Sequence, residues 1–166
     1  MTGRIFTADH HVYDLPPLLS WNVRHTGTVP CDSWSVTAVY QPEMLTVLRM
    51  AAGFAAIENE MTQLRGIVDE YTVELGSRGM TVTLSGRGYA ARLLDNESRP
   101  VTYEQVTLRE LIRCHAEPYG ISCGAAADLR STVPYTAGVG ISQWKVISEF
   151  CRTYGGFRSE ERRVGK

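Results

Sequence analysis

The sequence has few cysteines and no pattern that groups them. Its four cysteines, Cys31, Cys114, Cys123 and Cys151, are widely spaced along 166 residues, and no C-x-x-C pair occurs. This scatter favours neither a disulfide framework nor a zinc site, so we predict four free thiols. The histidines also lack the H-x-x-x-H or H-E-x-x-H spacing of metalloenzymes, and we expect no metal site.

Long apolar runs and an excess of one charge are also absent. No stretch approaches the roughly 20 apolar residues of a membrane span, and the N-terminal segment lacks the hydrophobic core of a signal peptide. Lys and Arg total 17 against 18 Asp and Glu, which gives a formal net charge of -1. A dedicated nucleic-acid surface or anionic-membrane surface requires a clear basic excess. We therefore expect a globular protein made in the cytoplasm, with no membrane span.

The first two thirds of the chain carry β-strand patterns. Apolar and hydroxyl side chains alternate over residues 33–40, which predicts a half-buried strand. The clearest hairpin covers residues 67–86, with a glycine-bounded turn at 76–79. Its expected inner face consists of Tyr71, Val73, Leu75, Met80, Val82 and Leu84. Further strands are expected within 14–25 and on both sides of a turn near Glu58 and Asn59. The pattern indicates an antiparallel sheet.

Helix signals are short in the first part of the chain and clearer after residue 100. Pro42 suits the first position of a short helix that we expect to stop at Gly53. Thr107 with Glu110 forms a capping box, and this helix should end at Pro118 and Gly120. Ser142 is the expected N-cap of a last helix, with an apolar stripe of Val146, Ile147, Phe150 and Cys151 and terminators Gly155 and Gly156. An extended segment is expected between these two helices.

One short motif suggests a nucleotide site but lacks its context. Gly86, Gly88 and Ala91 spell G-x-G-x-x-A after a strand. A dinucleotide fold requires a fully apolar parallel strand, a long helix and an acidic residue at the end of a second strand. Here the strand alternates with threonine inside a hairpin, and only two helical turns follow. We expect the glycines to supply backbone angles that other residues resist, and no cofactor to bind.

Candidate catalytic groups also lack partners in the sequence. Asp69 and Glu70 are neighbours on a strand, so their side chains should point to opposite faces rather than act as an acid and base pair. Asp95 and Glu97 suit turn hydrogen bonds. Ser85 is not in a G-x-S-x-G elbow and has no base in the pattern. We predict no catalytic residue and no enzyme activity.

Three segments in a fixed order resemble a known family. A strand-to-helix corner s-G-R-x-x-a-x-L-L-d lies at 85–95, a helix ending in yGi at 108–121, and S-x-W-x-V-I-x-x-x-C-x-x-x-G at 142–155. The structural corner comprises Gly86, Arg87, Gly88, Leu93 and Leu94. The order and spacing resemble the baseplate hub proteins of contractile-tailed bacteriophages, in particular prophage hubs of Gram-positive bacteria related to the late control gene D group. The resemblance covers roughly residues 12–157.

The resemblance implies a non-catalytic structural protein of the virion tail, made in the host cytoplasm. It implies an α+β chain: an antiparallel β-barrel, tail-tube-like hub domain with short helices over 1–100, then a small incomplete α/β domain over 101–157. The corner residues themselves predict that Tyr89, Leu93 and Leu94 cover an open end of the barrel. Family hubs form homotrimers that adapt the tail tube to the central spike, so the expected partners are further copies, tail tube, distal tail, spike and baseplate proteins. DNA would pass only transiently.

Four further expectations concern the end of the chain and the alternative functions. The family pattern continues beyond this length, so we expect an N-terminal fragment in which Trp144, Ile147 and Phe150 are less buried than in a complete domain. The charge cluster at 158–166 suggests an artefactual or disordered tail. A peptidoglycan-binding module, with a groove lined by Tyr119, Tyr135 and Trp144, is the alternative function. A nucleotide-binding enzyme is a more distant one.

Overall fold

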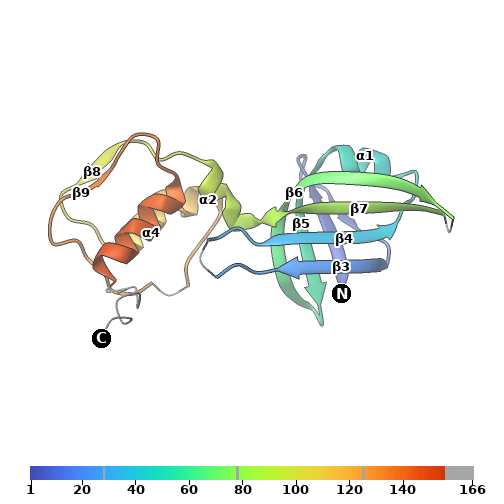
Figure 1. Cartoon of the computed structure of the whole chain (residues 1–166), viewed down its shortest axis with the longest axis horizontal. Coiled ribbons are helices and arrows are strands. Elements are labelled where there is room, and N and C mark those ends of the chain that lie inside the picture. Colours follow the sequence, from blue (N-terminus) through green and yellow to red (C-terminus); the bar gives the residue numbers. More distant parts are fainter. Residues whose placement is uncertain (28, 78, 125, 156–166) are drawn as a thin grey trace, which may run out of the picture. The chain divides into compact units, whose positions relative to one another are not determined.

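The computed structural model describes residues 1–27, 29–77, 79–124 and 126–155. The chain divides into two compact units between Ala91 and Arg92. In Figure 1 the first unit consists mainly of strands, and the second contains helices and a small two-stranded sheet. The charge cluster at 158–166, for which a disordered tail was expected, lies outside the described residues.

The first unit is a seven-stranded sheet with one short helix. Its elements are β1 (Thr2–Thr7), β2 (Val12–Asp14), β3 (Leu18–Arg24), β4 (Ser33–Val39), α1 (Met44–Arg49), β5 (Ala51–Glu58), β6 (Met61–Gly76), β7 (Gly79–Gly88) and the 3-10 turn η1 (Tyr89–Ala91). The strand order is β2-β1-β5-β6-β7-β4-β3, and each of these pairs is antiparallel. The predicted antiparallel sheet with short helices is confirmed.

The two outer strands of this sheet, β2 and β3, are neighbours in sequence. Only Leu15, Pro16 and Pro17 join them, so Asp14 and Leu18 lie within roughly 14 Å of each other. A short link between opposite edges requires the sheet to curl. No pairing joins β2 to β3 among the described residues, and the closed barrel expected from the sequence is not seen there. The first unit is a curled sheet with two open edges.

The core of the first unit lies on the inner face of the curled sheet. Trp34, Val36 and Ala38 are buried, as the alternation in β4 predicts. The predicted hairpin is also confirmed, since the inner residues named from the sequence pair as Tyr71 with Leu84, Val73 with Val82 and Leu75 with Met80. Leu75 is 81% exposed, however. The hairpin therefore extends beyond the core that its inner face was expected to cover.

The boundary between α1 and β5 differs from the prediction. The helix ends at Arg49 rather than at Gly53, and residues 51–53 begin β5 instead. The reason is the neighbouring strand, because Thr7 pairs with Ala51 and Phe6 with Gly53. The small residues at 51–53 have no strong preference between helix and strand, so the pairing with β1 determines their conformation. Strands β1 and β2 were not predicted at all.

The second unit packs two helices against a strand pair. It contains α2 (Arg92–Asp95), β8 (Val101–Tyr103), α3 (Leu108–His115), the 3-10 turn η2 (Glu117–Tyr119), β9 (Tyr135–Ala137) and α4 (Gln143–Tyr154). The capping box is confirmed, since the Thr107 hydroxyl accepts from the Glu110 backbone and the Glu110 carboxylate accepts from the Thr107 backbone. Ser142 caps α4 as predicted. The first predicted helix ends earlier than expected, at His115, and Gly120, with φ 76°, ends the 3-10 turn η2 that follows it.

The core of the second unit is well covered, contrary to the expectation for an incomplete domain. Phe150 is 0% exposed and Ile147 is 7% exposed, whereas Trp144 is half-buried. Tyr135 packs edge-on against Phe150, with ring centroids 5.1 Å apart. The expectation was wrong for Phe150 and Ile147 because β9 and the two helices enclose these side chains without further strands.

Candidate functional site

The predicted corner begins inside β7, and the structure requires glycine there for a different reason from the one expected. Neither Gly86 nor Gly88 is among the residues with positive φ. The prediction that they supply unusual backbone angles was therefore wrong. A Cβ atom on Gly86 would overlap the carbonyl oxygen of Ile67 and lie 2.9 Å from Cζ2 of Trp34. Gly86 is needed because β6 and an indole ring approach it closely.

Trp34 is the side chain that makes this close approach. Its indole ring stacks on Phe54 with ring centroids 4.0 Å apart, and its Nε1 donates a hydrogen bond to the Arg87 carbonyl oxygen at 3.2 Å. A Cβ on Gly66 would also collide with this ring. The indole ring thus packs over Gly66 and Gly86 on neighbouring strands. It fits there because neither glycine has a side chain. The corner thus accommodates the buried Trp34 indole in the core of the first unit.

Gly88 lies against the loop that connects β3 to β4. Its backbone N–H donates to the Asp32 carbonyl oxygen at 2.7 Å, and a Cβ there would lie 3.0 Å from the Asp32 Cβ. Burial favours a higher pKa for the Asp32 carboxyl, but hydrogen bonds from the Thr26 backbone and His25 outweigh it and lower that pKa. The Gly88 N–H already has the Asp32 carbonyl oxygen as its partner. Strand β7 pairs with antiparallel strands on both sides. The phosphate-binding turn of a dinucleotide fold follows a parallel strand, whereas both neighbours of β7 are antiparallel.

Arg87 forms a two-point ion pair across the sheet. Its Nε and Nη2 atoms lie 2.9 and 3.0 Å from the Asp69 carboxylate oxygens, and the Glu70 carboxylate accepts from the Ser85 hydroxyl at 3.0 Å. Ser85 and Arg87 are two residues apart on one strand and share a face. Both acids reach that face because the register of β6 shifts between Val68 and Glu70. The expectation that the two acids point to opposite faces was wrong.

The end of the predicted corner belongs to the second unit. Leu93 is buried in a cluster with Leu111 and Phe150, whereas Leu94 is half-buried. The prediction that Leu93 covers an open end of the barrel was therefore wrong, because this side chain lies in the core of the second unit. The chain passes from the first core to the second within a few residues of Ala91. The corner is best described as the connection between two separate cores.

The two open edges of the sheet expose apolar side chains. Trp21 on β3 pairs with Val36 and so lies on the inner face, yet it is 51% exposed because no described strand lies beyond β3. Leu19 on the same strand and Val12 on β2 are also exposed. Unpaired strand edges offer backbone hydrogen bonds to another strand. The edges of β2 and β3 are the surfaces of this unit best suited to bind another chain.

The second unit contains a cleft of about 460 Å³ above a buried polar network. The network joins three elements: Tyr103 on β8, His115 on α3 and Gln143 on α4. His115 is 5% exposed, and its Nε2 and Nδ1 atoms lie 3.0 Å from the Tyr103 hydroxyl and 2.5 Å from Gln143 Oε1. Gln143 Nε2 donates to the Glu97 carbonyl oxygen at 2.8 Å and to the Tyr119 hydroxyl at 3.2 Å. Sequence patterns placed His115 only within the helix that was expected to run from Thr107 to Pro118 and Gly120.

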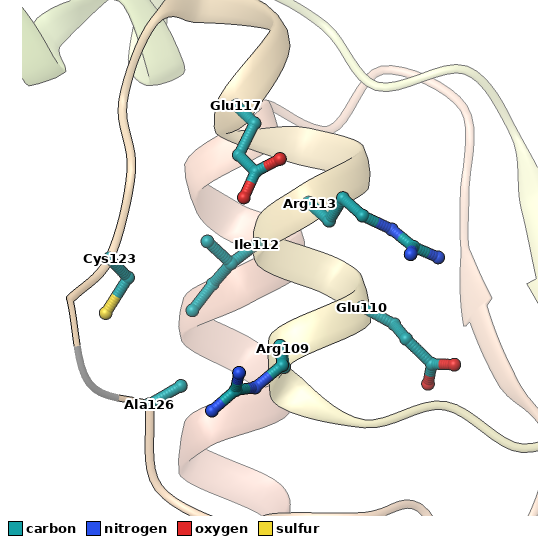
Figure 2. A pocket seen from close by; sticks show the side chains of 7 residues that line it. All are labelled: Arg109, Glu110, Ile112, Arg113, Glu117, Cys123 and Ala126. Carbon is teal, nitrogen blue, oxygen red and sulfur yellow. The ribbon is translucent and has the colours of Figure 1, made fainter.

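A second cleft, of about 230 Å³, lies along α3. Figure 2 shows that Arg109 and Ile112 extend toward the segment with Cys123 and Ala126, whereas Arg113 extends away from it. The charged side chains that line this second cleft thus diverge instead of pointing to one place. Convergent polar groups are typical of ligand sites, and this cleft lacks them.

Three predictions about residue chemistry can be compared with the described residues. The four cysteines are free, as predicted. Within the part of the chain that the structure describes, no group of three His, Cys, Asp or Glu side chains is placed to hold a metal ion. No helix in these ranges is long and apolar enough to cross a membrane. The described site features are therefore strand edges, a connecting corner and a polar cleft.

The fold is shared with solved phage tail proteins. A tail protein from Neisseria meningitidis MC58 superposes with a TM-score of 0.65 at 13% identity, over 91% of this chain and 45% of that one. The 43 kDa tail protein of prophage MuSo2 from Shewanella oneidensis gives a TM-score of 0.66 at 12% identity, over 92% and 49%. This chain thus spans about half the length of each. No protein-family model and no curated protein sequence matches it.

Proposed function

We propose that the chain is a structural component of a phage tail baseplate hub, located in the virion tail. The observation that carries this proposal is the fold, which both compared tail proteins share over about nine tenths of this chain. The order of motifs at 85–95, 108–121 and 142–155 supports the narrower assignment to hubs of the late control gene D type. In this proposal the protein adapts the tail tube to the central spike and has no catalytic function.

The first unit would supply the tube-like hub domain of a homotrimer. Its sheet is already curled, and its two edges, β2 and β3, have no strand partner in the described chain. Pairing of β3 with a neighbouring copy would cover Leu19 and Trp21, whose apolar side chains are exposed in the single chain. A closed ring of copies satisfies every such edge. The closed barrel expected from the sequence would then involve neighbouring chains.

The hub would form part of the channel through which DNA passes. The outer face of β7 carries Thr83 and Ser85, and the Thr83 hydroxyl lies 3.1 Å from that of Thr37. Arg87 on this face is neutralised by Asp69. Cationic walls would retain DNA phosphates, whereas a hydroxyl-rich face of balanced charge would let DNA slide. This supports transient rather than stable contact with DNA.

The proposal can be tested by the assembly state of the purified chain. Light scattering coupled to gel filtration should give three times the chain mass, and electron micrographs should show rings with a central channel. Trp21→Lys places a charge on the open β3 edge and should yield monomers. Val139→Lys, at an exposed position of the second unit, is the control and should leave the trimer intact. A native chain that stays monomeric at all concentrations would overturn the trimer.

The genomic setting tests the tail assignment independently. Genes for tape-measure and baseplate proteins should flank the coding sequence, and antibody labelling of induced prophage particles should mark the baseplate end of the tail. Metabolic neighbours, or label confined to the host cell, would contradict the proposal.

The alternative function, a peptidoglycan-binding module, was expected to have a groove lined by three aromatic residues. Of these residues, only Tyr119 lines the polar cleft, while the Tyr135 hydroxyl donates to the Val146 carbonyl oxygen inside the unit.

A further inference from the structure

The polar cleft of the second unit has the size and lining of a ligand site. Its volume of about 460 Å³ lies within the range of small-molecule sites, roughly 300–1,000 Å³. Three segments that are distant in sequence line it: β8 and the residues before it, the C-terminal end of α3 with η2, and the start of α4. The Ser142 cap fixes the start of α4, and the Ala116 N–H donates to the Ile112 carbonyl oxygen at the C-terminal end of α3.

The hydrogen bonds at the base of the cleft leave defined groups for a ligand. Gln143 Nε2 donates to a backbone carbonyl, so Gln143 Oε1 must accept from His115 Nδ1. His115 Nε2 then accepts a hydrogen bond from the Tyr103 hydroxyl. The Tyr119 hydroxyl accepts from Gln143, which leaves its own proton to be donated. Tyr119 thus presents a hydrogen-bond donor to the cleft.

The charge and shape of the lining restrict the class of ligand. Glu97 and Arg99 have opposite charges, so the rim offers ionic groups of both signs and no net charge. Val101, Pro118 and the Tyr119 ring add apolar surface beside these polar groups. An anionic ligand would face a carboxylate, and a purely apolar ligand would leave the polar groups without partners. A neutral ligand with hydroxyl, amide and small apolar groups fits this lining.

We propose that this cleft binds one sugar unit of a neutral, N-acetylated glycan. The sugar face would stack on the Tyr119 and Pro118 surface, and the acetamido methyl group would lie against Val101. Sugar hydroxyls would accept from Tyr119 and Arg99 and donate to the Glu97 carboxylate. Binding here is independent of the proposed assembly through the β3 edge, because the cleft lies wholly within the second unit.

The test is a nuclear magnetic resonance titration of the full chain with a tetramer of N-acetylglucosamine. Amide signals of residues 97–103, 114–119 and 143 should shift, and the matched glucose tetramer, which lacks acetamido groups, should shift them at least tenfold more weakly. Soluble glycan strands of peptidoglycan form a second arm that distinguishes a cell-wall source from other N-acetylated glycans. Shifts confined to other residues, or no shift with either N-acetylated glycan, would overturn the proposal.

Two variants separate binding from folding. Tyr119→Phe keeps the ring but removes the donor hydroxyl, and we expect roughly tenfold weaker binding, as for loss of one hydrogen bond. Arg99→Ala changes an exposed rim residue that the fold does not require, so a comparable loss with an unchanged spectrum elsewhere supports the cleft. Arg109→Ala, in the other cleft, is the matched control and should bind as the native chain does. Equal affinity for all four proteins would contradict the assignment.

Discussion

Substitution of the two corner glycines by alanine should have clearly different effects. Both glycines lie in β7 without positive φ, so neither backbone position penalises alanine. A Cβ on Gly86 would meet a main-chain oxygen of β6 and the Trp34 ring, neither of which can move away easily. A Cβ on Gly88 would meet one side-chain carbon of Asp32 at 3.0 Å, in a loop that can yield by a few tenths of an ångström.

The expected magnitudes follow from two opposing effects. Alanine lowers the entropy of the unfolded chain and so stabilises by about 0.4–1 kcal/mol. Overpacking a rigid site costs about 1–3 kcal/mol, and occasionally more. Gly86→Ala should therefore lower the free energy of unfolding of the first unit by about 2 kcal/mol, or its Tm by about 10 °C. Gly88→Ala should stay within about 1 kcal/mol of the native chain.

The assay is urea unfolding of both variants, followed by tryptophan fluorescence. Circular dichroism of the helices serves as the control, because the change should be confined to the sheet unit. Equal stability of Gly86→Ala and the native chain, or a larger loss for Gly88→Ala, would refute the close-approach argument.

Three more predictions concern the second unit. Gln143→Leu removes the partner of His115, and it should lower the free energy of unfolding by about 2–4 kcal/mol, measured by thermal unfolding, because buried polar groups lose their partners. Thr107→Ala should cost about 1 kcal/mol through loss of the helix cap, with faster amide hydrogen exchange in the first turn of α3. Burial raises the pKa of Tyr135 from 10.0 to about 12, so its proton is held more tightly in the folded state. This contribution to stability is complete below pH 10 and is lost as the pH rises to about 12, and Tyr135→Phe should abolish that part of an alkaline unfolding profile.

Control variants and contradicting outcomes sharpen these predictions. Ser148→Ala on the exposed side of α4 is the control for Gln143→Leu, and a change below about 0.5 kcal/mol would show that the network adds little. Thr102→Ala, also a threonine with an exposed hydrogen bond, is the control for the helix cap. A tyrosinate absorbance titration that shows every tyrosine ionising near pH 10 would contradict the burial of Tyr135.

Local patterns predicted the parts of the fold that local chemistry determines. The Tyr71 to Leu84 hairpin has strict alternation and glycines at its turn, so its register could be derived from the sequence. The Thr107 cap is likewise defined within four residues. Strand β1 was missed because Gly3 and Thr7 share its buried face with a single large apolar residue, Ile5. Its pairing with β5, a distant segment, gives it a strand conformation.

The candidate sites depended on contacts between distant segments. The role of Gly86 depends on Trp34 and Ile67, which no spacing in the sequence relates to it. The bulge beside Asp69 breaks the alternation on which the argument about opposite faces relied. The His115 network joins three elements separated by loops, so a helix position alone could not predict its burial. Sequence patterns give elements, whereas close approach and polar networks require the packed chain.

The strand order of the first unit also has a consequence for how the chain folds. Three local pieces can form early: the β1–β2 hairpin, the β3–β4 hairpin and the β5–β6–β7 meander. Two strand pairings must then form between segments distant in sequence: β1 with β5, where Thr2 pairs with Ile57, and β4 with β7, where Ser33 pairs with Arg87. Non-local pairing of this kind is slow. On the ribosome, β3 and β4 must wait until β7 emerges, so the apolar face of their hairpin is the part of the nascent chain that most needs protection from aggregation.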